Sequence, residues 1–372
     1  MKEKLYFAFF TRTPWSEIPR IRHQLANLLT AHGHHVTFFE KADFISSSGK
    51  TISHNLAVVP LPEIIHHQLR PLRSIGNAAN IFPKNFIAKY YSQTTLPDVI
   101  INFNYDFSFL KDIFPVVPLI TFINDDFIAQ AKPWMKKMIG KRLAETCSVS
   151  DAVFTVSYPL LRQVSGYNSN SYLFLPWAEK KYLAPPSGKE RNVALYFGYI
   201  NHRIDFDVLK KIATAKIPLR LIGPVQRTVN KAALEKLLNH ENVSLQDAQL
   251  LADVDLSDVC CSISPYDVKV ESVNACSISN RTFNLLSFGI PLLQPPLAET
   301  IKASSKVIRY CSTPEDFISG IEYFKNNFLD SQKDIGDFLN GNYSNDRYEF
   351  LIHQVNKLIL KPHNVEATDT GY

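Results

Sequence analysis

The chain of 372 residues carries 40 lysines and arginines against 35 aspartates and glutamates, and 45% of its residues are hydrophobic. This is enough apolar material for the cores of two ordinary domains and too much for intrinsic disorder. No apolar run approaches the roughly 18–20 residues that span a bilayer. The five cysteines are scattered, odd in number and lack a CxxC pair. Such a pattern favours a reducing cytoplasm over a disulfide scaffold or a zinc site.

The charge is unevenly distributed along the chain. Residues 1–177 hold 18 lysines and arginines against 12 aspartates and glutamates, whereas residues 178–372 hold 22 against 23. The basic first half indicates an anionic partner, such as a phospholipid surface or a phosphate-bearing acceptor. A solvated surface with chance asymmetry is an equally good explanation. Nucleic acid is not an expected partner, because the excess is small and lacks an interleaved aromatic and basic stripe.

Short apolar runs alternate with amphipathic stretches throughout the first half. The run 5–10 is too short for the core of a signal peptide and predicts a buried strand. The spacing of apolar residues over 20–32 predicts a helix, which Gly33 ends. Strands that are apolar on both faces and separated by helices predict a parallel sheet covered on both sides. The further strands expected here are 35–39, 98–103, 118–123, 152–156 and 172–175.

The same pattern restarts near residue 193, after a proline-containing linker at 175–186. The sequence therefore predicts an α/β protein of two doubly wound, parallel-sheet domains, over 1–177 and 178–345, followed by a helix and a polar tail at 346–372. The expected strands are 193–197, 219–222, 243–245, 259–264 and 291–293, and the expected helices are 206–215, 232–238 and 281–287.

The segment 277–293 is the richest in candidate site residues. Ser279 or Asn280 can cap a helix there, and Gly289 can end it. Arg281 and Asn284 then share a face of the first turn, where unpaired N–H groups and the helix dipole favour a diphosphate. Arg281 would donate to phosphate oxygens and Asn284 to ribose hydroxyls. The alternative is an ordinary capped helix that packs its apolar face on a sheet.

This segment resembles the donor-binding helix of GT-B glycosyltransferases, in which a basic residue is followed by Glu three positions later and by Gly-x-Pro. The segment 196–205 resembles the glycine-containing loop after the first strand of their C-terminal domain. Segments 219–224 and 264–266 follow the same order of signals. The resemblance covers most of 190–350 and the first half more loosely.

The resemblance implies two Rossmann-like domains facing each other across a cleft, with the last helix returning to the first domain. It also implies that the second domain binds a nucleotide-sugar donor, with a UDP-sugar favoured. The donor-binding residues that it implies are Gly198, Arg203, Gly223, Tyr266, Arg281, Thr282 and Asn284.

One departure from the family pattern is informative. Asn284 stands where the family usually has Glu, and no Glu lies seven residues before it, as in many retaining members. An amide at this place is similar to the glucuronosyltransferase of xanthan synthesis, an inverting enzyme that acts on a lipid-linked saccharide. The resemblance therefore implies inversion, a saccharide or lipid-linked acceptor, and a bacterial polysaccharide or glycolipid pathway.

An inverting transferase needs a general base for the acceptor hydroxyl. Asp125 and Asp126 directly follow the predicted strand 118–123 and look like an acidic pair found in related polysaccharide glycosyltransferases. Either could be the base. The alternative is that they cap a helix beginning near Ile128, and one acid could cap while the other acts as base.

The leaving diphosphate must be stabilised by fixed donors or by a metal. The resemblance implies arginines and helix termini, so we expect no metal and no cofactor, with Arg203 as the second phosphate ligand. Asp253 and Asp255 match the bare Asp-x-Asp pattern of metal-dependent transferases, but their helical or loop context predicts a solvated surface.

The loop after the first strand is the predicted acceptor site. Arg12 could hold an anionic acceptor there and Trp15 could stack on a sugar ring, while Arg20 and Arg22 read better as a basic start to the next helix. The segment 66–73, rich in histidine and arginine, is a candidate membrane-facing element.

Together these features predict a cytoplasmic glycosyltransferase, with attachment to the inner face of the cell membrane left open. Two alternatives remain. A sugar-nucleotide epimerase would share the GT-B shape, and a non-catalytic subunit of a polysaccharide assembly complex would bind the nucleotide sugar without turning it over.

Overall fold

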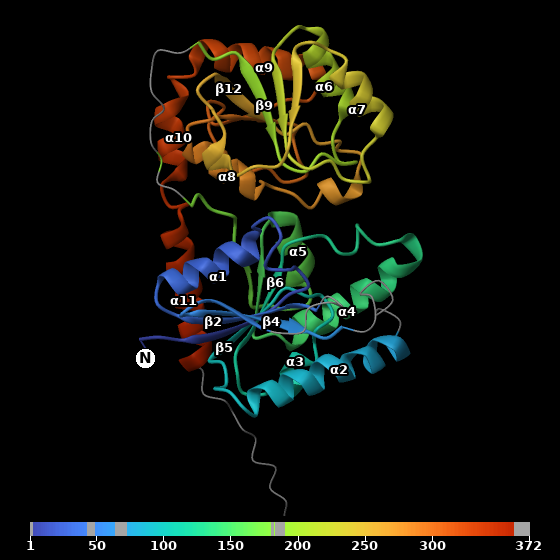
Figure 1. The fold of residues 1–372 in the computed structure, drawn as a ribbon, viewed down its shortest axis with the longest axis vertical. Coiled ribbons are helices and arrows are strands. Elements are labelled where there is room, and N and C mark those ends of the chain that lie inside the picture. The colour runs from blue at the N-terminus through green and yellow to red at the C-terminus, as the bar shows by residue number, and fades with distance from the viewer. Residues whose placement is uncertain (1–2, 43–48, 64–72, 180–181, 183–189, 361–372) are drawn as a thin grey trace, which may run out of the picture. The chain divides into compact units, whose positions relative to one another are not determined.

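The computed structural model describes residues 3–42, 49–63, 73–179, 182 and 190–360. The chain divides into two compact units, each built around its own sheet (Figure 1). Unit 1 comprises Met1–Val156, Leu160–Phe174 and Tyr348–Tyr372, and unit 2 comprises Ser157–Pro159 and Leu175–Arg347. The predicted α/β fold with two parallel-sheet domains is confirmed. No helix in the described part of the chain is long and apolar enough to cross a membrane.

The sheet of unit 1 has eight strands in the order β3-β4-β2-β1-β5-β6-β7-β8. All neighbours are parallel except β3 and β4, which form an antiparallel pair at one edge. This pair was not predicted from the sequence. The strands are β1 Tyr6–Phe10, β2 His35–Lys41, β3 Lys50–Ser53, β4 Leu56–Leu61, β5 Val99–Asn102, β6 Leu119–Ile123, β7 Ala152–Thr155 and β8 Ser171–Leu173.

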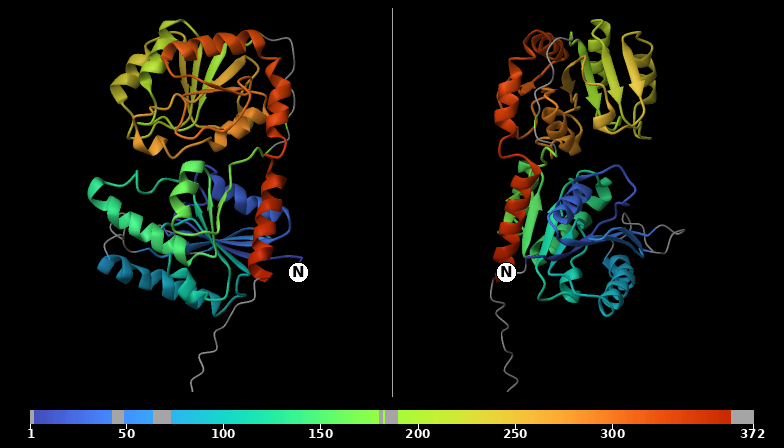
Figure 2. Two further views of the ribbon diagram at one scale, coloured as in Figure 1. Left: turned by 180° about the vertical axis from the view of Figure 1, so that it is seen from behind. Right: turned by 60° about the vertical axis from the view of Figure 1, so that its left-hand side comes forward.

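Helices cover both faces of this sheet (Figure 2). Successive side chains of a strand point to opposite faces, so Phe10 and Phe39 pack with the residues of α2 and α3. Phe9 and Phe38 lie on the other face, where Phe38 contacts His23 of α1. The helices are α1 Ile21–Ala31, α2 Arg73–Tyr91, α3 Leu110–Ile113, the 3-10 turn η1 Pro133–Met135, α4 Lys136–Val149 and α5 Tyr158–Ser165.

The last helix, α11 (Ser344–Leu360), supplies aromatic side chains to the core of unit 1. The ring of Tyr348 stacks on that of His32, with centroids 3.6 Å apart. The ring of Phe350 lies about 6 Å from three rings at the β7–β8 edge of the sheet, those of Phe154, Tyr172 and Phe174. These contacts are why the chain from Tyr348 onward groups with unit 1.

The sheet of unit 2 is fully parallel, in the order β11-β10-β9-β12-β13-β14. Its predicted strands and helices are confirmed; β14, α9 and α10 were not predicted. The strands are β9 Val193–Phe197, β10 Leu219–Ile222, β11 Val243–Gln246, β12 Val259–Ile263, β13 Leu292–Gln294 and β14 Ile308–Tyr310. The helices are α6 Phe206–Thr214, α7 Lys231–Leu238, η2 Leu251–Asp253, η3 Glu271–Val273, α8 Asn280–Ser287, α9 Pro314–Asn327 and α10 Ser331–Leu339.

The central strand β9 is buried on both faces. Ala194 and Tyr196 pack against a cluster that includes residues of α6, α7 and α9. Val193 and Leu195 belong to a second cluster, which includes Leu285 of α8. Helices α6, α7 and α9 therefore pack on one face of the sheet and α8 on the other, as in a doubly wound domain, and the carboxyl ends of the strands all reach one edge.

Two buried histidines make the stability of unit 1 depend on pH. His23 accepts a hydrogen bond at Nδ1 from the Arg20 amide and contacts the Pro14 carbonyl through Nε2, and His34 accepts from the Leu5 amide. Burial lowers the pKa of both rings, so folding disfavours their charged form.

Because the folded histidines bind protons more weakly than the unfolded ones, which titrate near pH 6.5, the folded state loses stability as the pH falls through that value, by up to about 1.4 kcal/mol per pH unit for each ring. We expect the melting temperature to drop between pH 7.5 and 5.5, with a shallower slope in the H23Q/H34Q variant. Thermal unfolding followed by circular dichroism measures both slopes, and equal slopes would contradict the assignment.

Candidate active site

The amino end of α8 is formed as the sequence predicted. Ser279 is the N-cap: its Oγ accepts from the Thr282 amide and lies 2.8 Å from Thr282 Oγ1. Gly289 ends the helix with a φ of 75°, a left-handed conformation in which glycine is favoured. The first turn of α8 therefore presents unbonded backbone N–H groups and the positive end of the helix dipole.

Arg281 lies in this first turn between two tyrosines. Its Nη2 donates to the Tyr266 hydroxyl at 2.9 Å and its Nη1 to the Tyr196 hydroxyl at 3.5 Å. The guanidinium carbon is 5.1 Å from the Tyr196 ring centre and 5.6 Å from that of Tyr266. Burial raises the pKa of Tyr196, so this hydroxyl stays neutral at pH 7. Within the described ranges Arg281 forms no ion pair, and its charge is not cancelled.

Two glycines shape the floor of this cluster. Gly198 follows β9 with a φ of 137°, and a Cβ atom there would lie 2.0 Å from Nη1 of Arg281. Gly223 follows β10 with a φ of 144°, and a Cβ atom there would lie 2.1 Å from the Gly198 carbonyl oxygen. Any other side chain at either position would therefore displace the Arg281 guanidinium or the loop beneath it.

Arg203 and Asn284 complete the predicted donor residues. Arg203 is half-buried, its positive charge opposes part of the rise that burial causes in the Tyr196 pKa, and its side chain has no hydrogen-bond or ion-pair partner in the described part of the chain. The Asn284 side chain is half-buried one helical turn after Arg281, and its amide likewise bonds to no described residue. The structure thus gathers Gly198, Gly223, Tyr266 and Arg281 in one cluster, with Thr282 bonded to the cap and Arg203 within electrostatic range.

Tyr196 was missed as a site residue in the sequence. It stands in the segment 196–205 that carries the glycine loop, but a tyrosine in a strand normally signals only the core. Its hydroxyl donates to the Tyr199 carbonyl at 2.6 Å, which leaves its oxygen facing Arg281. Tyr196 therefore fixes the orientation of the guanidinium.

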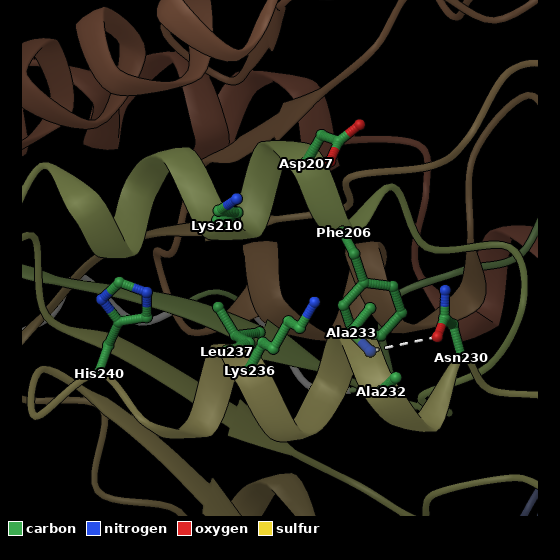
Figure 3. A pocket seen from close by; sticks show the side chains of 9 residues that line it. All are labelled: Phe206, Asp207, Lys210, Asn230, Ala232, Ala233, Lys236, Leu237 and His240. Atoms are coloured by element: carbon green, nitrogen blue, oxygen red, sulfur yellow. Dashed lines mark hydrogen bonds between the residues drawn. The ribbon is translucent and has the colours of Figure 1, made fainter.

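A cavity of about 270 Å³ lies between α6 and α7, apart from these residues (Figure 3). Lys210, Lys236 and His240 give its wall a basic character, and Asn230 caps α7 by accepting from the Ala233 amide. None of the nine lining residues belongs to the Arg281 cluster. The cavity therefore does not contribute to the predicted donor site.

Asp253 and Asp255 are exposed at η2, as expected for a solvated surface. In the described part of the chain, no group of histidine, cysteine, aspartate and glutamate side chains is arranged to hold a metal ion. The predicted membrane-facing segment at 66–73 lies outside the described residues, apart from the first residue of α2.

The acids after β6 differ in their surroundings. Asp126 Oδ1 accepts from the amides of Ile128 and Ala129 at 3.1 and 2.9 Å. Asp125 is held by side chains alone, accepting from Asn124 and Gln130 at 3.0 and 3.2 Å. Asp126 therefore performs the local capping, while the Asp125 carboxylate bonds to no backbone amide in the described part of the chain.

The helix expected to begin near Ile128 is wrong. Residues 127–130 form a turn, and the next helix, α4, begins only at Lys136 after the 3-10 turn at Pro133. A residue that precedes proline is disfavoured in the helical region, and Lys132 adopts an extended ψ of 144°. Proline at the first position of η1 then starts the next helical segment.

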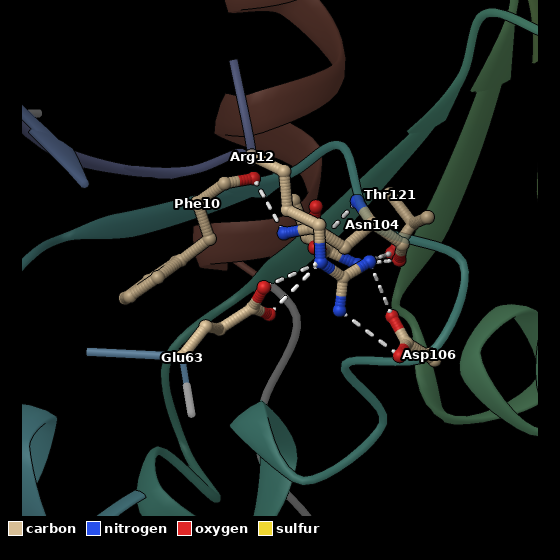
Figure 4. Close-up of polar contacts among 7 residues, drawn as sticks. Phe10, Arg12, Glu63, Asn104, Asp106 and Thr121 are labelled. Atoms are coloured by element: carbon tan, nitrogen blue, oxygen red, sulfur yellow. Dashed lines mark hydrogen bonds and ion pairs between the residues drawn. The ribbon is translucent and has the colours of Figure 1, made fainter. Parts of the chain in front are cut away.

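Arg12 is locked into an ion-pair network, rather than exposed on a loop (Figure 4). Its Nε lies 2.8 Å from Glu63 Oε1, and its Nη1 lies 2.9 Å from Asp106 Oδ1. The guanidinium also lies over the Phe107 ring. Both carboxylates are almost fully buried, so Arg12 already has two counter-charges and is poorly placed to bind an acceptor anion as well.

Replacing Arg12 with methionine should destabilise unit 1 by about 3–5 kcal/mol, because Glu63 and Asp106 would be left buried without a counter-charge. Urea unfolding monitored by tryptophan fluorescence would measure the loss. The triple variant R12M/E63Q/D106N should recover a large part of it, since neutral amides replace the stranded carboxylates. A loss in R12M below about 1 kcal/mol would place the network among ordinary exposed ion pairs.

Trp15 is half-buried beside α1. Its ring meets the Phe38 ring edge-on with centroids 5.0 Å apart and lies 5.2 Å from the His23 ring. Its backbone amide donates to Glu40. One part of the indole thus anchors the loop, and the stacking of its exposed part on a sugar ring stays a prediction.

No protein-family model matches the sequence, and no curated protein is detectably similar to it. Solved structures are similar in fold. The alpha,alpha-trehalose 6-phosphate synthase of Burkholderia multivorans matches with a TM-score of 0.65 at 9% identity, over 96% of this chain and 97% of that chain. HepE of Anabaena, in complex with UDP and glucose, matches with a TM-score of 0.63 at 9% identity, over 95% of this chain and 100% of that chain.

WaaG, a glycosyltransferase involved in lipopolysaccharide biosynthesis, matches with a TM-score of 0.59 at 13% identity, over 95% of this chain and 99% of that chain. All three likenesses extend over both units. At such low sequence identity these likenesses establish the fold, and the chemistry must be inferred from the residues of the site. The chain therefore has the GT-B fold.

Proposed function

We propose that the protein is a glycosyltransferase that moves a sugar from a nucleotide-sugar donor to a saccharide or lipid-linked acceptor. One observation carries the proposal: Arg281, at the open amino end of α8, is held by two tyrosine hydroxyls and has no carboxylate partner within the described ranges. A fixed cation of this kind fits the diphosphate of the donor. The GT-B fold of known glycosyltransferases supports the same assignment.

In this proposal unit 2 binds the donor. Arg281 and the α8 amides hold the diphosphate, Arg203 adds a second positive charge, and the Asn284 amide bonds to the ribose. A UDP-sugar is the favoured donor, because UDP and UDP-glucose are the ligands in the HepE structures. The fixed charges would stabilise the leaving group without a divalent metal. Transfer should therefore persist in excess EDTA.

We further propose inversion at the anomeric carbon with Asp125 as the general base. Asp126 already bonds to two backbone amides, whereas Asp125 bonds only to side chains. A carboxylate held in this way can accept a proton without breaking the turn. Asn284 in the place of the usual glutamate, as in the xanthan glucuronosyltransferase, supports inversion.

A screen of UDP-, GDP- and dTDP-sugars by thermal shift, followed by product analysis, tests the proposal. We expect saturable stabilisation by one nucleotide class, and release of its diphosphate only when an acceptor is present. Conversion of the donor without acceptor would identify an epimerase. Stabilisation with no turnover for any acceptor would identify a non-catalytic binding subunit, and no stabilisation by any nucleotide would contradict the donor site.

We also propose that the enzyme is cytoplasmic and attaches to an anionic membrane through unit 1. Trp134 is 59% exposed, and residues 127–144 around it hold five lysines and arginines and no acid. Exposed tryptophan with lysine is typical of interfacial segments. Sedimentation with phosphatidylglycerol vesicles should require Trp134, and equal binding to neutral phosphatidylcholine vesicles would contradict the attachment.

A further inference from the structure

A second arginine in unit 1, Arg22, is as deeply buried as the core but forms no ion pair with any described residue. Arg22 is 7% exposed, at the second position of α1. Its Nη1 donates to the hydroxyls of Thr11 and Thr13, and its Nε has no hydrogen-bond partner in the described part of the chain. Its guanidinium also lies 5.5 Å from the centre of the Phe103 ring.

Arg12, the other buried arginine of this region, differs from Arg22 in having carboxylate partners. Arg12 lies ten residues earlier, and two carboxylates contact it within 3.0 Å. No described carboxylate forms an ion pair with Arg22. Burial therefore lowers the pKa of Arg22 to about 10. The more distant negative charges of Asp125 and Glu17 offset only part of this decrease, and the positive charge of Arg20 adds to it. A buried cation without an ion-pair partner destabilises the folded state. Such a residue is typical of a binding site, where a ligand supplies the missing negative charge.

The groups around Arg22 offer hydrogen-bond donors. The Thr11 hydroxyl accepts from Arg22 and from the Thr13 amide, and the Thr13 hydroxyl accepts from Arg22, so each still has its own hydrogen to donate. The first amides of α1 add unbonded N–H groups and the positive end of the helix dipole. A ligand here must therefore supply several acceptor oxygens and negative charge, which describes a phosphate group.

The position of the cluster relates it to Asp125. Thr11 directly follows β1, and Asp125 follows β6; in the sheet only β5 separates these two parallel strands. Both groups thus lie at the same carboxyl edge, where ligands of open α/β sheets bind. A single acceptor could reach both, with its anionic group at Arg22 and its reacting hydroxyl at Asp125.

We propose that Arg22, Thr11, Thr13 and the amino end of α1 bind a phosphate group of the acceptor, so that the acceptor is a phosphorylated saccharide or a saccharide linked to a lipid through phosphate. Arg22 is then a specificity-determining residue. That the bound phosphate belongs to an acceptor rests on the proposed function. The phosphate site itself lies wholly within unit 1, and phosphate binding can be measured without donor or turnover.

Isothermal titration of the full chain with three probes tests the site: glucose 6-phosphate, farnesyl diphosphate and unphosphorylated glucose. We expect one of the two phosphorylated probes to bind, and glucose not to bind. Preference for glucose 6-phosphate would indicate a soluble sugar phosphate, and preference for farnesyl diphosphate a lipid-linked acceptor. In R22Q the Kd of that probe should rise by about 10–100-fold, the value of one charged hydrogen-bonding partner, and R22K should recover part of the loss.

Two control variants separate the possible failures. R220Q removes an arginine that pairs with Asp258 in unit 2, and it should leave the Kd within about twofold, a change of under half a kcal/mol. R281Q should lose UDP binding and keep phosphate binding, so a failed donor site would leave this inference standing. The melting temperature of R22Q without ligand should equal or exceed that of the unmodified protein, because a buried uncompensated charge is removed. Phosphate binding that survives in R22Q, or no binding of either phosphorylated probe, would overturn the site.

Discussion

Replacing Asp125 with asparagine is expected to lower kcat for sugar transfer by about 10²–10⁴-fold, the usual contribution of a positioned general base. The amide keeps the size of the side chain and one of its two acceptor oxygens, and Asn124 or Gln130 can rotate its own amide to present an oxygen to the new NH2 group, so the turn after β6 should persist. The KM for the donor should change little, since the donor residues belong to unit 2. Steady-state release of the nucleoside diphosphate, with circular dichroism as a check on folding, measures the effect.

Asp126→Asn is the matched control, because it makes the same carboxylate-to-amide replacement in the neighbouring residue. Asp126 accepts from two backbone amides through one oxygen, and the asparagine amide oxygen can accept the same two bonds, so stability should change little. Its effect on kcat should be much smaller than that of D125N. If D126N lost more activity than D125N at equal folding, the base would be Asp126, and the assignment made from their hydrogen bonds would be wrong.

The parallel strands of both units could be predicted because their signal is local. Residues such as those of β9 and β6 form short apolar runs, which a strand buried on both faces requires. The amino end of α8 was equally readable, since a capping serine, a helical spacing of apolar residues and a terminal glycine each act within one helix. Local sequence features were thus sufficient to predict the parallel-sheet fold and the position of Arg281 at the start of a helix.

The antiparallel edge of unit 1 lacked such a signal. The four residues of β3 are all exposed, and β4 contains Pro60, which usually argues against a strand. β3 pairs with β4 only over Leu56–Val58, so Pro60 lies beyond that pairing and its missing N–H removes no bond to β3. Only the contacts of β4 with β2 decide that this segment is extended.

The roles of the two buried arginines also depend on partners far away in the sequence. Arg12 was the predicted anion ligand, yet its carboxylates lie 51 and 94 residues further along the chain. Arg22 was read as a basic helix start, and only the structure shows that it is buried and forms no ion pair with any described residue. Which of two nearby arginines is neutralised is a property of the tertiary structure, and a linear pattern could not distinguish them.

Replacing Arg281 with glutamine should lower kcat/KM by about 10²–10³-fold, the loss typical when one fixed donor to a developing negative charge is removed. UDP should stabilise R281Q against heat much less than it stabilises the unmodified protein. Arg309 offers a matched control, because its guanidinium also lies over a tyrosine ring in unit 2, 4.4 Å from the centre of Tyr323. R309Q removes the same charge and the same kind of ring contact, and it should keep its UDP response.

Gly198→Ala should reproduce this loss without touching the charge. Its Cβ would lie 2.0 Å from Nη1 of Arg281, at a φ of 137° that alanine rarely adopts, so the guanidinium must move. If the glycine acts only by admitting Arg281, the double variant G198A/R281Q should bind UDP no more weakly than R281Q, which is the non-additivity expected of residues in contact. Independent, additive losses would mean that Gly198 contacts the nucleotide through its own backbone. Full UDP binding in R281Q would remove the electrostatic basis of the donor site, whatever G198A did.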